Sequence, residues 1–158
     1  MIKLKEKTIF YFTVIALLSI SCDHIYKEYN KESFATLSWK EGQTVSFYPE
    51  VEDVAKTYEL ILGVRHLYGA RIKRLDVSIK IISPSGKETT KQYGFDLVNE
   101  KGDYLASCAG NMCDLETVVD ADLKFSEPGK HQVVITPQTG VGIVRGIMEF
   151  GLIIDKKD

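Results

Sequence analysis

Apolar and polar residues alternate along most of the chain after residue 37. In the segment 75–81 every second residue is aliphatic and the residues between are polar, and the segments 58–66 and 145–154 show a similar alternation. A period of two is typical of a β-strand that buries one face. The pattern predicts further strands at residues 44–47, 88–95, 103–107, 117–125 and 131–136.

Segments rich in Pro, Gly and Asn separate these strands. Ser83-Pro84-Ser85-Gly86 carries Ser, Pro and Gly at the positions that a type I turn favours. The segments 99–102 and 127–130 are two more predicted turns. No stretch of about 12 residues has a helical period. The sequence therefore predicts an all-β fold, an antiparallel β-sandwich over residues 37–158, with jelly-roll topology as one candidate.

The N-terminal segment has a different pattern. Three lysines within the first seven residues precede an apolar run that ends before Cys22. This run is shorter than the roughly 20 residues that a membrane span needs, and with its basic start it is typical of a signal peptide. We predict a signal peptide over residues 1–21.

The segment Leu18-Ser19-Ile20-Ser21-Cys22 is similar to the bacterial lipobox, whose Cys receives a diacylglycerol before cleavage. It departs from the usual pattern at Ser19, where a Leu is common. We predict lipidation of Cys22 and a membrane anchor; the alternative is an ordinary secretory signal that contains a Cys. The polar, mixed-charge residues that follow predict a tether, so that residues 22–36 hold the lipidated Cys and its tether.

Charge narrows the choice of partners. The chain has 20 basic and 22 acidic residues, a net charge of −2. Removing residues 1–21 takes away three basic residues and one acidic residue, which leaves about −4. No basic stripe is present, which argues against nucleic acid as a partner and against electrostatic docking to anionic lipid.

Motifs of catalysis are absent from the sequence. It contains no Gly-x-Ser-x-Gly and no His-Glu-x-x-His. The glycine-rich segment 139–146 misses the dinucleotide-binding pattern, because Arg145 stands where the third Gly belongs. We therefore expect a non-enzymatic protein with no cofactor and no metal. A secreted enzyme is the weakest alternative, since it needs convergent carboxylates or a His pair in a cleft.

Cys108 and Cys113 form a disulfide or half of a zinc site. Zinc needs two more ligands, and the three histidines of the chain are not at ligand spacing to the pair. Lipidation of Cys22 would leave these two cysteines as an even pair in an oxidising compartment. We therefore predict a disulfide that clamps a protruding loop.

A short basic segment is the main candidate for a binding surface. Residues 65–74 contain four Lys and Arg side chains and one Tyr. In a chain of net negative charge this segment would bind an acidic partner or a glycan; the alternative is a solvated hairpin tip. The candidate partner-binding residues are Arg65, Tyr68, Arg71, Lys73 and Arg74.

Glycan binding is the alternative function, because β-sandwiches often bind sugars through exposed aromatic side chains. Trp39, Tyr68 and Tyr104 are the candidate platforms. A cluster of these rings on one concave face would favour glycan binding, and burial of Trp39 in the core would count against it.

The order of motifs resembles the gliding-motility lipoprotein GldH family over nearly the whole mature chain. Its most specific part is the C-terminal strand, Arg145-Gly146-Ile147-x-Glu149-Phe150-Gly151-Leu152-x-Ile154. The chain departs from the family at Leu67-Tyr68-Gly69-Ala70, where the family tends to have an Asn-Tyr-Pro-Tyr-like stretch, and the Cys108–Cys113 pair is an addition. The other matching features are Cys22-Asp23 with the Tyr-rich segment 25–29, Trp39, Val45-x-Phe47, the alternating segment 58–66, Ser83-Pro84-x-Gly86, Tyr93-x-Phe95-Asp96-Leu97, Gly102-x-Tyr104-Leu105 and Phe125-x-x-Pro128-Gly129-Lys130-His131.

This resemblance implies a cell-envelope lipoprotein that supports surface gliding, although members also occur in bacteria that do not glide. The family is not known as an enzyme family, and no catalytic or binding residue is carried over from it. We expect a structural or assembly component of gliding or of an associated secretion apparatus. It would be anchored to the inner or outer membrane, face the periplasm or the cell exterior, and contact other envelope proteins.

Overall fold

The computed structural model describes residues 24–140 and 142–157. The predicted signal peptide and Cys22 lie outside these residues. The elements, in order, are β1 (His24–Asn30), the 3-10 helix η1 (Glu32–Phe34), β2 (Ser38–Lys40), β3 (Val45–Phe47), β4 (Glu50–Val51), β5 (Tyr58–Leu67), β6 (Arg74–Ile82), β7 (Glu88–Asp96), β8 (Ser107–Ala109), β9 (Met112–Leu123), β10 (Gly129–Lys130), β11 (Gln132–Pro137), β12 (Ile143–Arg145) and β13 (Ile147–Lys156).

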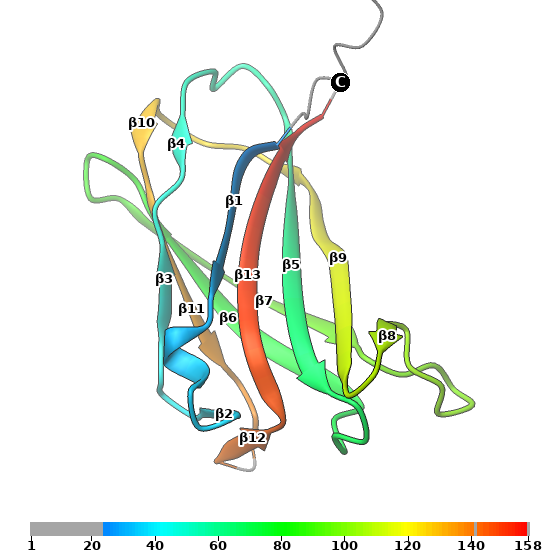
Figure 1. Ribbon diagram of the computed structural model, residues 1–158. Coiled ribbons are helices and arrows are strands. Elements are labelled where there is room, and N and C mark those ends of the chain that lie inside the picture. Colours follow the sequence, from blue (N-terminus) through cyan, green and yellow to red (C-terminus); the bar gives the residue numbers. More distant parts are fainter. Residues whose placement is uncertain (1–23, 141, 158) are drawn as a thin grey trace, which may run out of the picture.

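Two antiparallel sheets form the body of the molecule (Figure 1). One has the strand order β1-β13-β5-β9-β8 and the other the order β3-β11-β6-β7. Two short pairs, β10-β4 and β12-β2, complete the structure. The prediction of an all-β, antiparallel sandwich is confirmed.

The alternation in the sequence follows the inner faces of these sheets. Leu60, Leu62 and Val64 of β5 are buried, as are Val77 and Ile79 of β6. Full burial of such a side chain contributes about 1.5–3 kcal/mol, so each strand is held by its apolar set. Register is fixed by the same set, because a slip of one residue would turn it toward water.

Part of the predicted tether, residues 24–30, is instead a strand of the domain. His24–Asn30 form β1, which pairs with β13 from His24↔Asp155 to Asn30↔Phe150. Phe34 of η1 is buried, and its ring contacts that of Trp39 with centroids 5.4 Å apart. β1 was missed because it is the outer strand and most of its side chains are exposed, so no alternation marks it.

Two other expectations need correction. The strand predicted at residues 103–107 is mostly loop, with a single bridge between Val98 and Tyr104, and β8 begins only at Ser107. β9 begins at Met112, earlier than expected, and continues to Leu123. The pairs β2–β12 and β4–β10 are two or three residues long, too short to show a period.

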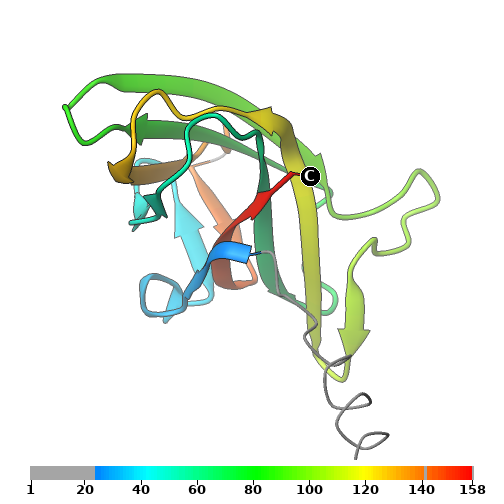
Figure 2. The same ribbon diagram turned by 90° about the horizontal axis from the view of Figure 1, so that it is seen from above.

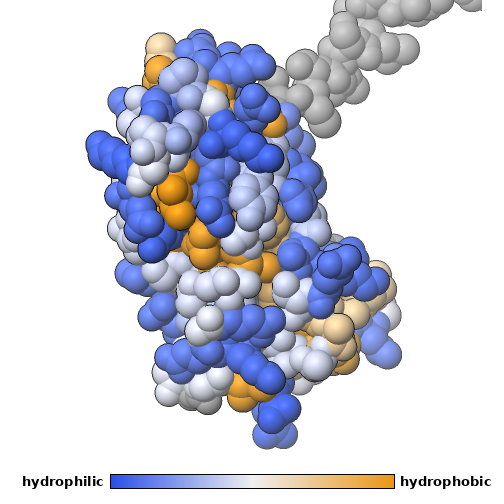
Figure 3. Space-filling model, turned by 90° about the vertical axis from the view of Figure 1, so that its left-hand side faces the viewer, coloured by the Kyte–Doolittle hydropathy of each residue, from blue (hydrophilic) through white to orange (hydrophobic). Residues whose placement is uncertain are grey.

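Tyr26 joins β1 to the other sheet. Its hydroxyl accepts a hydrogen bond from the backbone N–H of Tyr48, at 3.0 Å, and donates one to Glu28. Burial, together with the bond to Glu28, raises the pKa of Tyr26 to about 12. The seam between β1 and the segment after β3 lies on the side of the molecule shown in Figure 3, where hydrophobic residues appear as small patches among hydrophilic ones.

Tyr29 crosses the outer face of the larger sheet over two glycines. Gly151 of β13 and Gly63 of β5 are cross-strand partners, and a Cβ on either would lie 2.6 Å or less from the Tyr29 side chain. The Tyr29 hydroxyl reaches Glu116 of β9 and donates a 2.6 Å hydrogen bond. One side chain from β1 therefore spans β13 and β5 to contact β9.

We predict that Gly151→Ala destabilises the protein by about 1–3 kcal/mol, because the added methyl group displaces the Tyr29 ring. The same substitution in a Tyr29→Ala background should be neutral or stabilising, since Ala is favoured over Gly within a strand. Urea denaturation of the four proteins measures the free energy of unfolding. Equal losses in both backgrounds would show that the ring is not the cause.

Candidate functional site

The end of the sandwich farthest from the start of β1 gathers several loops, and we call it the distal end. It comprises the β5–β6 loop (residues 68–73), the β7–β8 loop (97–106), the β8–β9 turn (110–111) and the segments 138–140 and 142–145. β5 begins level with the start of β1 and ends here at Leu67, about 30 Å away for a ten-residue strand. Figure 1 shows these loops at the end opposite the start of β1.

Backbone hydrogen bonds tie the loops together. Tyr68 N donates to Asn111 O at 2.9 Å, and Leu97 N donates to Lys73 O at 2.8 Å. The Tyr104 hydroxyl accepts from Gly69 N at 2.9 Å and donates to Ala70 O at 3.2 Å. The surface is therefore built on anchored loops.

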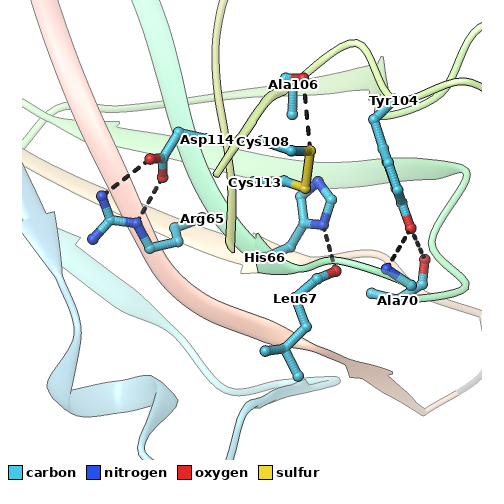
Figure 4. The surroundings of a disulfide bond; sticks show 10 residues. Arg65, His66, Leu67, Ala70, Tyr104, Ala106, Cys108, Cys113 and Asp114 are labelled. Carbon is cyan, nitrogen blue, oxygen red and sulfur yellow. Dashed lines mark hydrogen bonds and ion pairs between the residues drawn. A yellow bond between two sulfur atoms is a disulfide. The ribbon is translucent and has the colours of Figure 1, made fainter. Parts of the chain in front are cut away.

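A disulfide at the distal end joins the edge strand β8 to β9, close to His66 (Figure 4). Cys108 of β8 is bonded to Cys113 of β9, directly across the ladder, which confirms the predicted pairing. Gly110, with a φ of +60°, and Asn111 form the two-residue turn between these strands. The bond clamps this hairpin, and Cys113 anchors it in the interior.

His66 packs against the same region from the interior of the protein. Its Nδ1 is 3.0 Å from the carbonyl oxygen of Leu67, and its ring centroid is 5.1 Å from that of Tyr104. Since a carbonyl accepts, Nδ1 carries the proton. With its ring fully buried beside β9, His66 is a structural residue of the hairpin and does not face solvent.

Two of the five candidate binding residues are already paired within the protein. Arg65 makes ion pairs to Asp114 at 2.6 Å and to Glu149 at 3.1 Å. The hydrogen bond to Asp114 raises the pKa of Arg65 and outweighs its partial burial. Arg74 is paired in the same way with Asp76 and Asp96, at 2.9 and 3.1 Å.

Arg71 and Lys73 make no ion pair within the described part of the chain, and the fold brings Arg145 to them. The three side chains line one groove of about 480 Å³ beside Gln138 and Ile143. Arg145 was not among the predicted binding residues, because it is more than seventy positions further along the sequence. We call Arg71, Lys73 and Arg145 the cationic groove.

A glycine permits this approach. Gly146 has a φ of +94°, and a Cβ there would lie 2.7 Å from the Cβ of Ala70. Its N–H donates to Leu37 O at 2.7 Å, while its carbonyl accepts from Leu67 N at 2.8 Å. Any larger residue at position 146 would push the β5–β6 loop away from β12.

Exposed apolar side chains accompany the cations. Tyr68 is 62% exposed, Leu105 52% and Met112 44%, and Leu37 is 41% exposed on the neighbouring β2 side. Tyr68 also contacts Tyr104, with ring centroids 5.5 Å apart. Apolar residues rimmed by charge at one end of a domain are typical of a protein-binding surface.

The structure contradicts the glycan-binding alternative at its main platform. Trp39 is fully buried, packs against Phe150 at 4.6 Å and donates its indole N–H to Gln43 O at 2.8 Å. Tyr104 is partly buried, and its hydroxyl is hydrogen-bonded to the backbone of the β5–β6 loop. Of the three predicted platforms, only Tyr68 is available on the surface.

Acidic residues are likewise engaged in structural contacts. Asp120 accepts hydrogen bonds from Tyr93 at 2.6 Å and Lys91 at 2.9 Å, and Asp122 is paired with Lys157 at 3.0 Å. Among residues 24–140 and 142–157, no three or more His, Cys, Asp and Glu side chains gather as a metal site would require. In the same residues, no helix has the length and hydropathy to cross a membrane.

Sequence comparison identifies related proteins. The profile of the family described as GldH lipoprotein matches residues 24–154. The protein named "Gliding motility lipoprotein GldH" of Flavobacterium johnsoniae is 26% identical over 152 residues, which cover 90% of this chain and 92% of that protein.

Similar solved structures include CBM28, a carbohydrate-binding module specific for non-crystalline cellulose. It has 9% identity, a TM-score of 0.41 and coverage of 84% of this chain and 73% of that one. The insecticidal delta-endotoxin Cry8Ea1 of Bacillus thuringiensis has 9% identity and a TM-score of 0.43, with coverage of 77% and 19%. At these TM-scores the likeness carries no argument about function.

We predict that Cys108→Ala/Cys113→Ala lowers the free energy of unfolding by about 2 kcal/mol, because the cross-link no longer restricts the conformations of the unfolded chain. Chemical denaturation measures this loss. Hydrogen exchange at the Tyr68 amide, which bonds the clamped turn, should accelerate in the variant more than exchange at Leu62 in the middle of β5. Uniform acceleration of both amides would mean that the bond does not order the distal end specifically.

Proposed function

The chain belongs to the GldH lipoprotein family, and from this premise we propose that it is a non-enzymatic assembly component of gliding motility or of an associated secretion apparatus in the cell envelope. The observation that carries the proposal is the distal end, where unpaired cations and exposed apolar side chains share one rigid surface. A docking role requires such a surface and does not require a catalytic cleft.

The partner that fits the distal end is an envelope protein with carboxylates beside an apolar patch. Arg71, Lys73 and Arg145 would meet the carboxylates, since the acidic residue that lines the groove, Asp76, is paired with Arg74 at 2.9 Å. Tyr68 and Met112 would supply the apolar contacts, and aromatic and Met side chains are enriched at protein interfaces.

The proposed anchor orients this surface. Only Asp23 separates Cys22 from the first residue of β1, and two residue steps extend to about 7 Å at most. Lipidation of Cys22 would therefore hold the start of β1 at the membrane. The distal end would then point away from the lipid, toward the periplasm or the cell exterior, where envelope partners are accessible.

We predict that Arg71→Glu/Lys73→Glu abolishes partner contact while the protein stays folded. A photo-crosslinking amino acid at Tyr68, in cells of the source bacterium, should give a discrete crosslinked product that the double variant loses. The same amino acid at Tyr48, beside β1, should give no such product.

The matched control is Lys56→Glu/Lys130→Glu, which reverses two exposed cations near the start of β1 and β5. It should leave the crosslink at Tyr68 unchanged, because the added negative charges lie far from the distal end. A crosslink that survives reversal of the cationic groove, or that is lost equally in both pairs, would contradict docking through the distal end.

We predict that metabolic labelling with radioactive palmitate marks the wild-type protein and not Cys22→Ala. The expected variant is an unlabelled chain that no longer partitions with the membrane fraction. Label retained in Cys22→Ala, or wild-type protein released unlabelled into the medium, would exclude the lipid anchor and with it the proposed orientation.

A further inference from the structure

A second surface feature lies away from the distal end, where the two sheets diverge beside β7. Ile79 and Lys91 are cross-strand partners, as are Ile81 and Thr89, and partners in an antiparallel ladder share a face. Thr89 and Lys91 therefore lie on the core side of the sheet, yet both are exposed. The inner face of β6 and β7 extends beyond the cover that β9 provides.

The uncovered part of this face forms a cavity. Its floor is apolar and consists of Ile79 and Ile81 from β6, Leu123 at the end of β9, and Phe125 in the segment after β9. Figure 2 shows the segment after β9 running beside the β6–β7 hairpin. The cavity has a volume of about 120 Å³, which at about 30 Å³ for each water holds roughly four groups of that size.

One side of the cavity is closed by contacts between the two sheets. Tyr93 and Lys91 of β7 both bond to Asp120 of β9, at 2.6 and 2.9 Å. Burial acts to raise the pKa of Asp120, but the hydrogen bonds from Tyr93 and Lys91 outweigh it and lower this pKa. Asp120 thus stays ionised, and its contacts fix the width of the cavity.

The rim is basic. Lys87 and Lys124 line the cavity and make no ion pair within residues 24–140 and 142–157, in contrast to Lys91. Glu88 of the β6–β7 hairpin is paired with Lys80 at 2.9 Å, and Glu127, between β9 and β10, accepts a 2.6 Å hydrogen bond from Ser85. Two lysines without an ion pair therefore border an apolar floor.

His131 forms part of the cavity wall, so its ring can serve as a probe of the cavity. Its Nδ1 is 3.0 Å from Gly129 O, so this nitrogen carries the proton, and its ring packs on Phe125 at 4.8 Å. Its Nε2 is buried and has no hydrogen-bond partner among the described residues. A change in the cavity contents should therefore alter the Nε2 environment.

We propose that this cavity binds a small amphiphilic carboxylate, with its apolar chain on Ile79, Ile81 and Leu123 and its carboxylate between Lys87 and Lys124. A concave apolar site with a few convergent polar groups is typical of small-molecule sites, and the free ammonium groups select an anion. The site is separate from the distal end and does not depend on the proposed docking role.

Sodium octanoate is the probe, because it joins a carboxylate to an unbranched apolar chain. The protein is the oxidised chain from residue 22 onward with Cys22→Ala, which contains every described residue. Titration followed by methyl NMR should give saturable shifts at Ile79, Ile81 and Leu123, together with a change in the His131 Nε2 resonance. Acetate, which lacks the apolar chain, and 1-octanol, which lacks the charge, should each bind at least tenfold more weakly.

Two variants locate the site. Lys87→Gln/Lys124→Gln should weaken octanoate binding roughly tenfold, as expected for two partly exposed ion pairs, whereas Lys56→Gln/Lys130→Gln should leave it unchanged. Thr89→Phe, which keeps strand propensity and fills the cavity, should abolish the methyl shifts.

Absence of saturable shifts at these methyl groups would overturn the proposal. Equal affinity for octanoate and 1-octanol, with no effect of Lys87→Gln/Lys124→Gln, would overturn the assignment of an anionic ligand. Neither result would bear on docking through the distal end, which is tested by different residues.

Discussion

The position of β13 between β1 and β5 is the constraint on which the other features depend. β13 pairs with β5 from Ile147 to Lys156 and with β1 from Phe150 to Asp155, and its inward side chains are fully buried: Phe150, Leu152 and Ile154. Phe150 contacts Trp39 and thereby positions the short β2–β12 pair. Gly146, just before β13, sets how closely the β5–β6 loop approaches Arg145. The register of one strand thus determines both the core and the geometry of the distal end.

The basic residues of the segment 65–74 show why a cluster in the sequence is not yet a site. Arg65 and Arg74 lie on strands, where cross-strand neighbours on β9, β13 and β7 provide carboxylates at ion-pair distance. Arg71 and Lys73 lie in the loop between those strands, where no ladder supplies a partner. Strand neighbours neutralise two of the four cations, and the loop leaves the other two free to act on another molecule.

The sequence predicted the parts of the fold in which one side of a strand is buried. β5, β6 and β13 alternate clearly, so their positions and inner faces followed from the period. β1 could not be found in this way, because most of its side chains are exposed and its stability comes from backbone pairing with β13 and from Tyr29. The disulfide was predictable from the cysteine count, whereas the approach of Arg145 to Arg71 depends on long-range topology. The cavity beside β7 has only a weak signal, the polar residues Thr89 and Lys91 at inward positions.

The register of β1 has a mechanical consequence. If the chain is held at Cys22 and pulled by a partner at the distal end, the load enters the fold at His24 and runs along the axis of β1. The backbone bonds to β13 lie perpendicular to that axis, so the six paired positions from His24 to Asn30 resist the load together in shear. Attachment at the other end of β1 would instead peel the pairs apart one at a time. The same Tyr29 ring that bridges Gly151 and Gly63 would then oppose sliding of β1 along the sheet, because its movement is blocked across two strands.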